Sequence, residues 1–109
     1  MIEDYQEHRS RLRQIMMDNG LEGFHDYEVI ELLLQYVYPR RDTKPKAKKL
    51  LTYFNDDIHA LFHASEKELI KAGLTEYGAS LIIVVRKAFI YQQKKKITGQ
   101  TFIHSSQEV

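Results

Sequence analysis

The stretch DYEVIELLLQYVY, residues 26–38, decides the fold class. Its apolar side chains fall on almost every face of a helix, which is typical of a helix covered on several sides in the middle of a domain. Asp26 is a candidate N-cap, because its carboxylate can accept hydrogen bonds from the N–H groups of the first turn. Pro39 closes the helix, since the residue before a proline is pushed out of the α region. The sequence therefore predicts a central, buried helix around which other helices pack.

A helix over residues 3–19 is predicted upstream of this segment. Arg9 and Arg13 lie four residues apart and so share a face of it. Gly20 follows Asn19 and supplies the left-handed conformation that commonly ends a helix. The apolar side of this helix is formed by His8, Leu12, Ile15 and Met16.

Three helices are predicted between residues 42 and 72. Asp42 or Thr43 caps the first, which has Pro45 in its first turn, where the missing N–H is harmless. Ser65 and Glu68 match a capping box at the start of the last. The apolar positions of these helices are Ala47, Leu50, Leu51 and Phe54, then Ile58, Leu61 and Phe62, and then Leu69.

A long final helix is predicted from Tyr77 to Lys96, and Gly99 ends it. Its β-branched run over residues 81–85 is compatible with a strand, but its length and lack of turn signals favour a helix. The side chains expected to face inward are Leu81, Ile82, Val85, Ala88 and Phe89. We therefore expect an all-α domain over residues 1–97, a compact orthogonal bundle of five to six helices, followed by a polar linker or tail over residues 98–109.

Composition bounds the class of protein. The 109 residues suffice for one self-sufficient domain, and the absence of cysteine fits a reducing compartment. The start of the chain is acidic where a secretory leader would be basic. The longest apolar run, Leu81–Val85, is far shorter than the roughly 20 residues that span a bilayer. The expected location is the cytoplasm, with no membrane partner.

The formal net charge is only +1, but basic residues cluster within residues 40–49. Asp42 is the one acidic residue among them, and Lys94–Lys96 form a second basic run. A cluster of this kind is either the solvated face of a helix or a partner site, and the sequence leaves both open. The basic side chains of the cluster are Arg40, Arg41, Lys44, Lys46, Lys48 and Lys49.

Signals for catalysis are weak. The sequence lacks a cysteine nucleophile, a phosphate-binding glycine loop and a serine elbow. Glu28 and Glu31 can share a face, although such pairs are usually solvated edges of a helix. His59 and His63 have helical spacing, but zinc needs three or four ligands and no motif supplies the others. We predict no catalytic residue, cofactor or metal site in this chain.

Several segments together resemble the N-terminal helical region of the RadC family. They are HRSRLR at residues 8–13, GLEGFHDYE at residues 20–28, ELLL at residues 31–34, and PRRDT at residues 39–43 with Pro45. The match extends over about residues 5–95. Residues 69–79 fall where that family carries a helix-hairpin-helix-like segment, in which a glycine-bearing turn lets backbone N–H groups approach DNA phosphates without base contacts.

In the RadC family this helical region precedes a JAB/MPN-type domain that resembles zinc metallopeptidases. The signature of that domain, a glutamate followed by His-x-His, a serine and an aspartate, is absent here, so its metal chemistry is carried over to no residue. The segment Phe102–Val109 resembles the entry into it. The resemblance thus implies a piece of a longer protein or a shortened member, and a JAB/MPN-type domain as partner.

The hairpin departs from the family pattern at two positions. The family pattern is glycine, an apolar residue and a second glycine, with a basic residue a few positions on, whereas this chain has Gly73-Leu74-Thr75 and then Gly78. Thr75 resists the positive φ that a second glycine supplies. Gly78 stands where the family pattern has a basic residue, so a phosphate contact is lost. The candidate DNA-binding residues are Arg40, Arg41, Thr43, Lys44, Lys46, Gly73, Thr75, Tyr77 and Gly78.

Two functions follow as expectations. The first is sequence-independent, phosphate-dominated DNA binding, which the basic cluster and the hairpin resemblance favour. The second is a scaffold that packs on the JAB/MPN-type domain or self-associates, which the altered hairpin and the near-neutral charge favour. The second function predicts an exposed apolar patch. The family label, DNA repair, is part of the resemblance and follows from no residue in the chain.

Overall fold

The computed structural model describes the backbone of residues 2–106 and the side chains of residues 6–98. The described chain is entirely helical apart from its connections, with no strand, so the all-α prediction is confirmed. Its helices are α1 (Ile2–Asn19), α2 (Asp26–Leu34), α3 (Lys44–Tyr53), α4 (Ile58–Phe62), α5 (Glu66–Lys71) and α6 (Glu76–Ser106).

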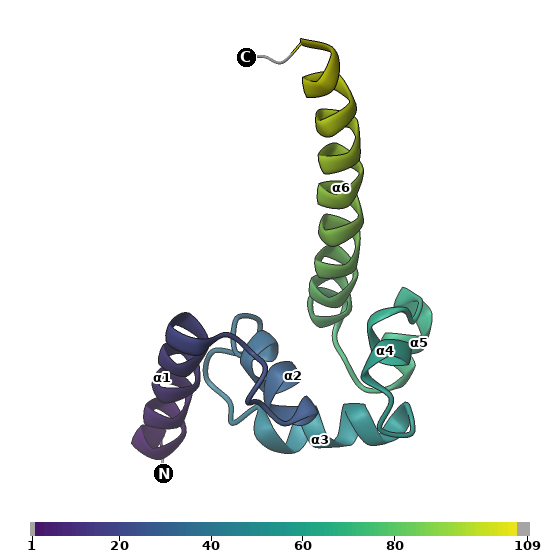
Figure 1. Ribbon diagram of the computed structural model, residues 1–109. Helices are drawn as coiled ribbons and strands as arrows, with labels where there is room; N and C mark the ends of the chain where they lie inside the picture. The colour runs from purple at the N-terminus through teal and green to yellow at the C-terminus, as the bar shows by residue number, and fades with distance from the viewer. Residues whose placement is uncertain (1, 107–109) are drawn as a thin grey trace.

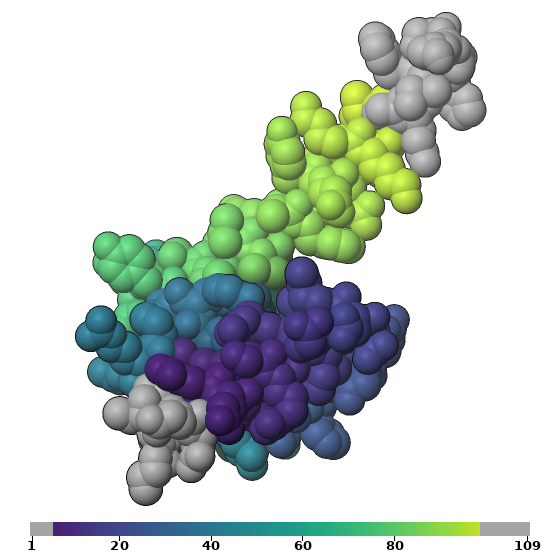
Figure 2. All heavy atoms as spheres, turned by 90° about the vertical axis from the view of Figure 1, so that its left-hand side faces the viewer, coloured from purple at the N-terminus to yellow at the C-terminus, as the bar shows by residue number. Residues whose placement is uncertain are grey.

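The helices form a bundle from which the end of α6 projects (Figure 1). α2 lies over one end of α3 with α1 packed beside α2, and α4 and α5 lie over the other end of α3. α6 starts against α5 and α4 and then rises clear of the remaining helices, so the molecule measures 57 × 33 × 22 Å. The projection is also plain in the space-filling view (Figure 2). Within residues 2–106, no helix is long and apolar enough to cross a bilayer.

The core sits where α2 to α6 meet, because each of these helices buries at least one large aliphatic side chain there. Fully burying a side chain of this kind stabilises the fold by about 1.5–3 kcal/mol. Tyr38 and Ala79 close the side of the core that faces the turn before α6. The aliphatic side chains with almost no exposed surface are Ile30, Leu34, Leu50, Leu61, Leu69 and Ile82.

Two predicted helix ends are confirmed, the capping box of α5 and the glycine that follows α1. Ser65 and Glu68 form the predicted capping box, in which Glu68 N–H donates to Ser65 Oγ at 3.2 Å and Ser65 N–H donates to Glu68 Oε1 at 3.1 Å. Gly20 follows α1 with φ +80°. The prediction that Asp26 is the N-cap of α2 is wrong, because the N-cap is His25. Glu28 reaches back to accept a hydrogen bond from His25 N–H at 2.9 Å, which gives this carboxylate a capping role.

The central helix is shorter than the predicted residues 26–38. α2 ends at Leu34, whose carbonyl accepts from Val37 N–H and Tyr38 N–H in a final turn over residues 35–38. Pro39 sets the limit as expected, but the chain tightens one turn earlier. The consequence is that Tyr36 points into solvent, whereas Tyr38 is buried.

The last helix is longer than predicted and less covered. α6 begins at Glu76 and continues through Gly99 to Ser106, so helix replaces the expected tail over residues 98–106; residues 107–109 lie outside the described part. A single glycine costs a helix only about 1 kcal/mol, which does not stop a segment without proline. Ala88 and Phe89, expected to face inward, are exposed, although Phe89 still lines a shallow pocket with Phe62 and His63 at the edge of the bundle.

Candidate functional site

The fold brings the two predicted DNA-binding segments to one groove. The groove runs between α3 and the turn that precedes α6. Arg41, Lys46 and Lys49 line it, and Asp42 is the one acidic residue of its lining. Gly73 lies in this turn, where its carbonyl accepts from Lys46 Nζ at 3.4 Å. These segments are separated by more than 25 residues in the sequence, so their meeting is a property of the fold. We call this feature, with its three cations, the basic groove.

Gly73 makes the turn at the edge of the basic groove. Its φ of +119° lies in a region that L side chains rarely adopt, while an added Cβ would meet nothing within 4 Å. The glycine is therefore required by backbone conformation and not by crowding. It lets the next residue, Leu74, turn back and bury its side chain in the core.

Thr75 caps the start of α6. Its Oγ1 accepts from Gly78 N–H at 3.1 Å, and its own N–H donates to the Tyr38 hydroxyl at 3.0 Å. Tyr38 Oη and Thr75 Oγ1 also share a hydrogen bond of 3.1 Å. Thr75 is not among the residues with positive φ, so the threonine causes no backbone strain. The N–H groups of Thr75 and Gly78 are thus satisfied within the protein.

Two predicted site residues are buried. Thr43 has 1% of its surface exposed, and its hydroxyl donates to the Glu31 carbonyl at 3.1 Å, so its side chain joins α3 to α2 and does not face solvent. Gly78 is buried as well, and a Cβ added there would lie 2.9 Å from the Tyr38 hydroxyl. Both corrections reflect tertiary packing that a helix-start pattern cannot show.

The other predicted residues reach the surface. Arg40, Arg41, Gly73, Thr75 and Tyr77 are exposed, and Lys44 and Lys46 are half-buried. The two lysines are held against aromatic rings. Lys46 Nζ lies 5.1 Å from the centroid of the Tyr38 ring, and Lys44 Nζ lies 5.8 Å from that of Tyr27. Contacts of this kind limit the freedom of the charged groups without neutralising them.

A buried arginine holds the loop that carries Arg40 and Arg41. The Arg9 side chain reaches from α1 with 7% of its surface exposed. Its guanidinium donates to the carbonyls of Tyr38 and Pro39, each at 2.6 Å, and to the carbonyl of Arg41. The planar fork of arginine suits several acceptors at once. Sequence reasoning missed this role because the acceptors lie about 30 residues away.

Glu31 is buried, contrary to the solvated edge that its pattern favours. Only 1% of the residue is exposed, and Oε2 lies 2.7 Å from His8 Nε2. Burial raises the pKa of the Glu31 carboxyl above its ordinary value, and the Asp42 carboxylate adds to the rise, while His8 and Lys44 oppose it. With Glu28 used as a cap, the two glutamates have separate structural roles.

Replacing Glu31 by glutamine should shift stability in a pH-dependent direction. Because the pKa of Glu31 is raised in the fold, its contribution is full below the unfolded pKa and is lost as the pH rises through the folded value. The side chain in Glu31→Gln cannot ionise. The free energy of unfolding of this variant, minus that of the natural chain, should therefore be higher at about pH 7 than at about pH 4. Urea unfolding at both pH values measures this difference, and an unchanged difference would contradict the account.

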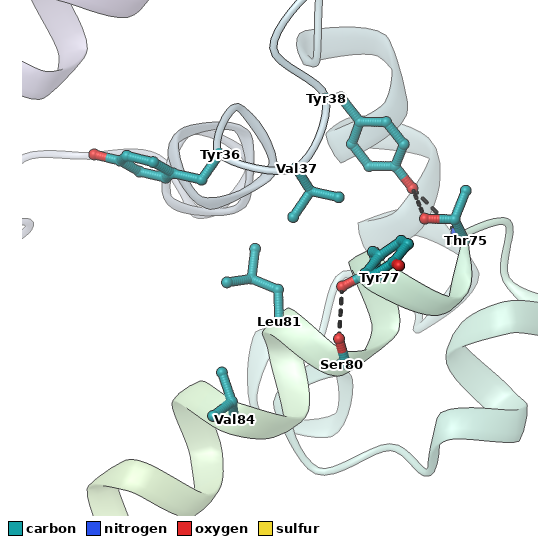
Figure 3. Close-up of a pocket in the computed structure, with 8 residues that line it drawn as sticks. All are labelled: Tyr36, Val37, Tyr38, Thr75, Tyr77, Ser80, Leu81 and Val84. Carbon is teal, nitrogen blue, oxygen red and sulfur yellow. Dashed lines mark hydrogen bonds between the residues drawn. The ribbon is translucent and has the colours of Figure 1, made fainter.

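A second groove lies next to the basic groove and is mainly apolar (Figure 3). Val37, Leu81 and Val84 are its apolar lining, and Tyr36 and Tyr77 lie at opposite sides, with the Tyr36 ring pointing away from the other lining residues. Further lining comes from Tyr38, Thr75 and Ser80. We call it the tyrosine groove.

The histidine pair gives no metal centre in the described part of the chain. His59 and His63 are exposed, with stacked rings whose centroids lie 4.1 Å apart. His63 Nδ1 lies 2.8 Å from the His59 carbonyl oxygen. Among the residues that the structure describes, no group of three histidine, cysteine, aspartate or glutamate side chains is placed to hold an ion.

The chain is similar to bacterial proteins known as UPF0758 proteins. One from Fusobacterium nucleatum is 48% identical over 66 residues, which are 61% of this chain and 28% of that protein. One from Ruegeria pomeroyi is 46% identical over 50 residues, or 46% of this chain and 22% of that protein. One from Rhodobacter capsulatus is 42% identical over 50 residues, or 46% of this chain and 23% of that protein.

These matches span only about a quarter of the length of the curated relatives. No family model matches the sequence. No solved structure matches it either.

Proposed function

We propose that this chain is a non-catalytic helical module that binds DNA without sequence preference, through the basic groove. The observation that carries the proposal is the convergence of Arg41, Lys46 and Lys49 with the turn at Gly73 on one open surface. Arg40 extends the positive charge along the exposed loop. Phosphates attract such a surface whatever the base sequence, and released counterions drive the binding.

Side-chain charge, and not the hairpin backbone, is the proposed source of affinity. The hairpin N–H groups of Thr75 and Gly78 already donate within the protein. At the start of α3, Lys44 N–H donates to Asp42 Oδ1 at 3.1 Å, and Pro45 has no N–H. The exposed arginines have no comparable role in the core, and Arg9 holds their backbone in place from behind.

We propose further that the chain corresponds to the helical N-terminal region of a RadC-like protein, with a JAB/MPN-type domain as partner. Support comes from the segments quoted above and from the similarity to UPF0758 proteins, which are much longer than the matched region. In this assignment the chain supplies DNA contact in the cytoplasm, and a separate domain supplies any chemistry.

Fluorescence anisotropy of labelled duplex DNA, titrated at several salt concentrations, tests the proposal. We expect log K to fall linearly with log salt concentration, by about 0.9 for each phosphate contacted. Arg40→Ala/Arg41→Ala should weaken binding and reduce the slope by about two. Both side chains are exposed, so the double variant should keep its thermal stability.

Lys94→Ala/Lys95→Ala is the matched control, because it also removes two exposed positive charges, but from the projecting part of α6. It should leave the salt slope unchanged. Binding that is insensitive to salt, or equal losses in the two double variants, would rule out the basic groove as the DNA-binding surface.

A second function, as a protein-interaction scaffold, is favoured by the projecting part of α6. Its exposed apolar side chains suit a helix that packs on a JAB/MPN-type domain or on another copy of this chain. Absence of DNA binding at low salt, together with a solution mass above that of the monomer, would place this function first. The large exposed apolar residues in this part of α6 are Phe89 and Ile90, which line a pocket with Phe62 and His63, and Tyr91 and Ile97 farther along.

A further inference from the structure

Tyr36 and Tyr77 are exposed beside the basic groove, and neither belongs to the core; a third exposed tyrosine, Tyr53, lines the basic groove itself. Tyr36 has 61% and Tyr77 has 79% of its surface exposed. They lie at the two sides of the tyrosine groove, with Val37 and Leu81 between them (Figure 3). Exposed aromatic rings beside an apolar surface offer faces on which a ligand can stack.

The two grooves share a wall. Tyr38 and Thr75 line the tyrosine groove, whereas Gly73 and Leu74, in the same turn, line the basic groove. Lys46 joins the two sides, because its Nζ lies 5.1 Å from the Tyr38 ring centroid and 3.4 Å from the Gly73 carbonyl oxygen. A chain whose phosphates follow the basic groove therefore passes the edge of the tyrosine groove.

We infer that the tyrosine groove holds unpaired bases of a single DNA strand whose phosphates lie in the basic groove. The inference rests on the proposed function and names its substrate class: single strands and forks in preference to plain duplex. Bases in a duplex stack on each other and cannot enter, whereas an unpaired base exposes a flat face. Stacking on tyrosine is tolerant of sequence because every base has such a face.

Charge complementarity selects this occupant over an apolar protein segment. A protein segment would cover the apolar lining of the groove but would gain nothing from Arg41 and Lys46 alongside it. A nucleic acid strand uses both features in one contact, with its phosphates on the cations and its bases on the rings. Tyr36 on the turn after α2 and Tyr77 on α6 are also held by different elements, so their relative placement is fixed by the fold.

The experiment compares two single strands of equal length and equal phosphate count, an oligothymidine and a strand of abasic sites, by fluorescence anisotropy. The natural chain should bind the oligothymidine more tightly. Tyr36→Leu/Tyr77→Leu should lower the affinity for the oligothymidine by at least about fivefold per tyrosine, to the affinity for the abasic strand. Tyr36→Phe/Tyr77→Phe keeps the aromatic faces and should retain the affinity.

Tyr91→Leu is the matched control, since Tyr91 is also exposed on α6 but lies about 20 Å farther along the helix from Tyr77. It should bind both strands as the natural chain does. Equal affinity for the two strands, or no effect of Tyr36→Leu/Tyr77→Leu, overturns the inference and leaves phosphate binding intact. Failure of both strands and of duplex DNA to bind at low salt overturns the proposed function and the inference together.

Discussion

Arg9→Met is expected to lower the free energy of unfolding by about 3 kcal/mol, because it removes a buried charged donor that three carbonyls share. The carbonyls of Pro39 and Arg41 are part-buried, and the buried Tyr38 carbonyl would keep only the longer bond of 3.4 Å from Arg41 N–H. A buried acceptor that loses its partner costs about 1–3 kcal/mol. Such a loss is a large share of the roughly 5–15 kcal/mol that stabilises a domain. Urea unfolding followed by circular dichroism measures it.

Arg9→Lys tests whether the shape of the Arg9 guanidinium or only its positive charge stabilises the fold. Its ammonium keeps the positive charge but lacks the planar fork that spans three acceptors, so about half of the loss should remain. Arg11→Met is the control, because Arg11 is exposed two residues farther along α1, and it should change stability by less than about 0.5 kcal/mol. Similar effects of Arg9→Met and Arg11→Met would show that the Arg9 contacts contribute little.

The fold class could be predicted from the sequence because the signals that specify helices lie within the helices and at their ends. Capping boxes, helix-ending glycines and apolar periodicity act within one or two turns, and Ser65 and Gly20 behaved as such signals predict. Burial of polar groups depends instead on contacts distant in the sequence. Glu31 is covered because His8 of α1 packs over it, and Thr43 because its hydroxyl reaches the Glu31 carbonyl.

The candidate site was predictable in its charges but not in its geometry. A run of cations is visible in any sequence, whereas the meeting of Lys46 with Gly73 requires the whole bundle between them. The tyrosine groove is the clearest case, because Tyr36 and Tyr38 are two residues apart, yet Tyr36 is exposed and Tyr38 is buried. Both follow the end of α2 at Leu34, and only Tyr38 reaches the core.

That position of Tyr38 makes Gly78→Ala the second large expected effect, with a net loss of about 2 kcal/mol. The new Cβ would lie 2.9 Å from the Tyr38 hydroxyl and 3.3 Å from a Leu74 methyl group, so the ring must shift. The shift breaks the hydrogen bonds that hold Thr75 at the start of α6. Alanine gains only about 1 kcal/mol as a helix former, which does not offset these losses. Thermal unfolding should show a midpoint lower by roughly 10 °C.

Ser80→Ala controls for helix propensity, because Ser80 is exposed in the same first turns of α6 and its hydroxyl bonds only to the Tyr77 carbonyl within that turn. It should shift stability by less than about 0.5 kcal/mol. Tyr38→Phe supplies the decisive comparison, since it removes the oxygen that the new methyl group would strike. Gly78→Ala should therefore cost clearly less in the Tyr38→Phe background than in the natural chain, which a double-mutant cycle reads directly as a coupling energy. A coupling energy of zero would mean that the glycine serves Leu74 or the backbone and not the close approach of Tyr38.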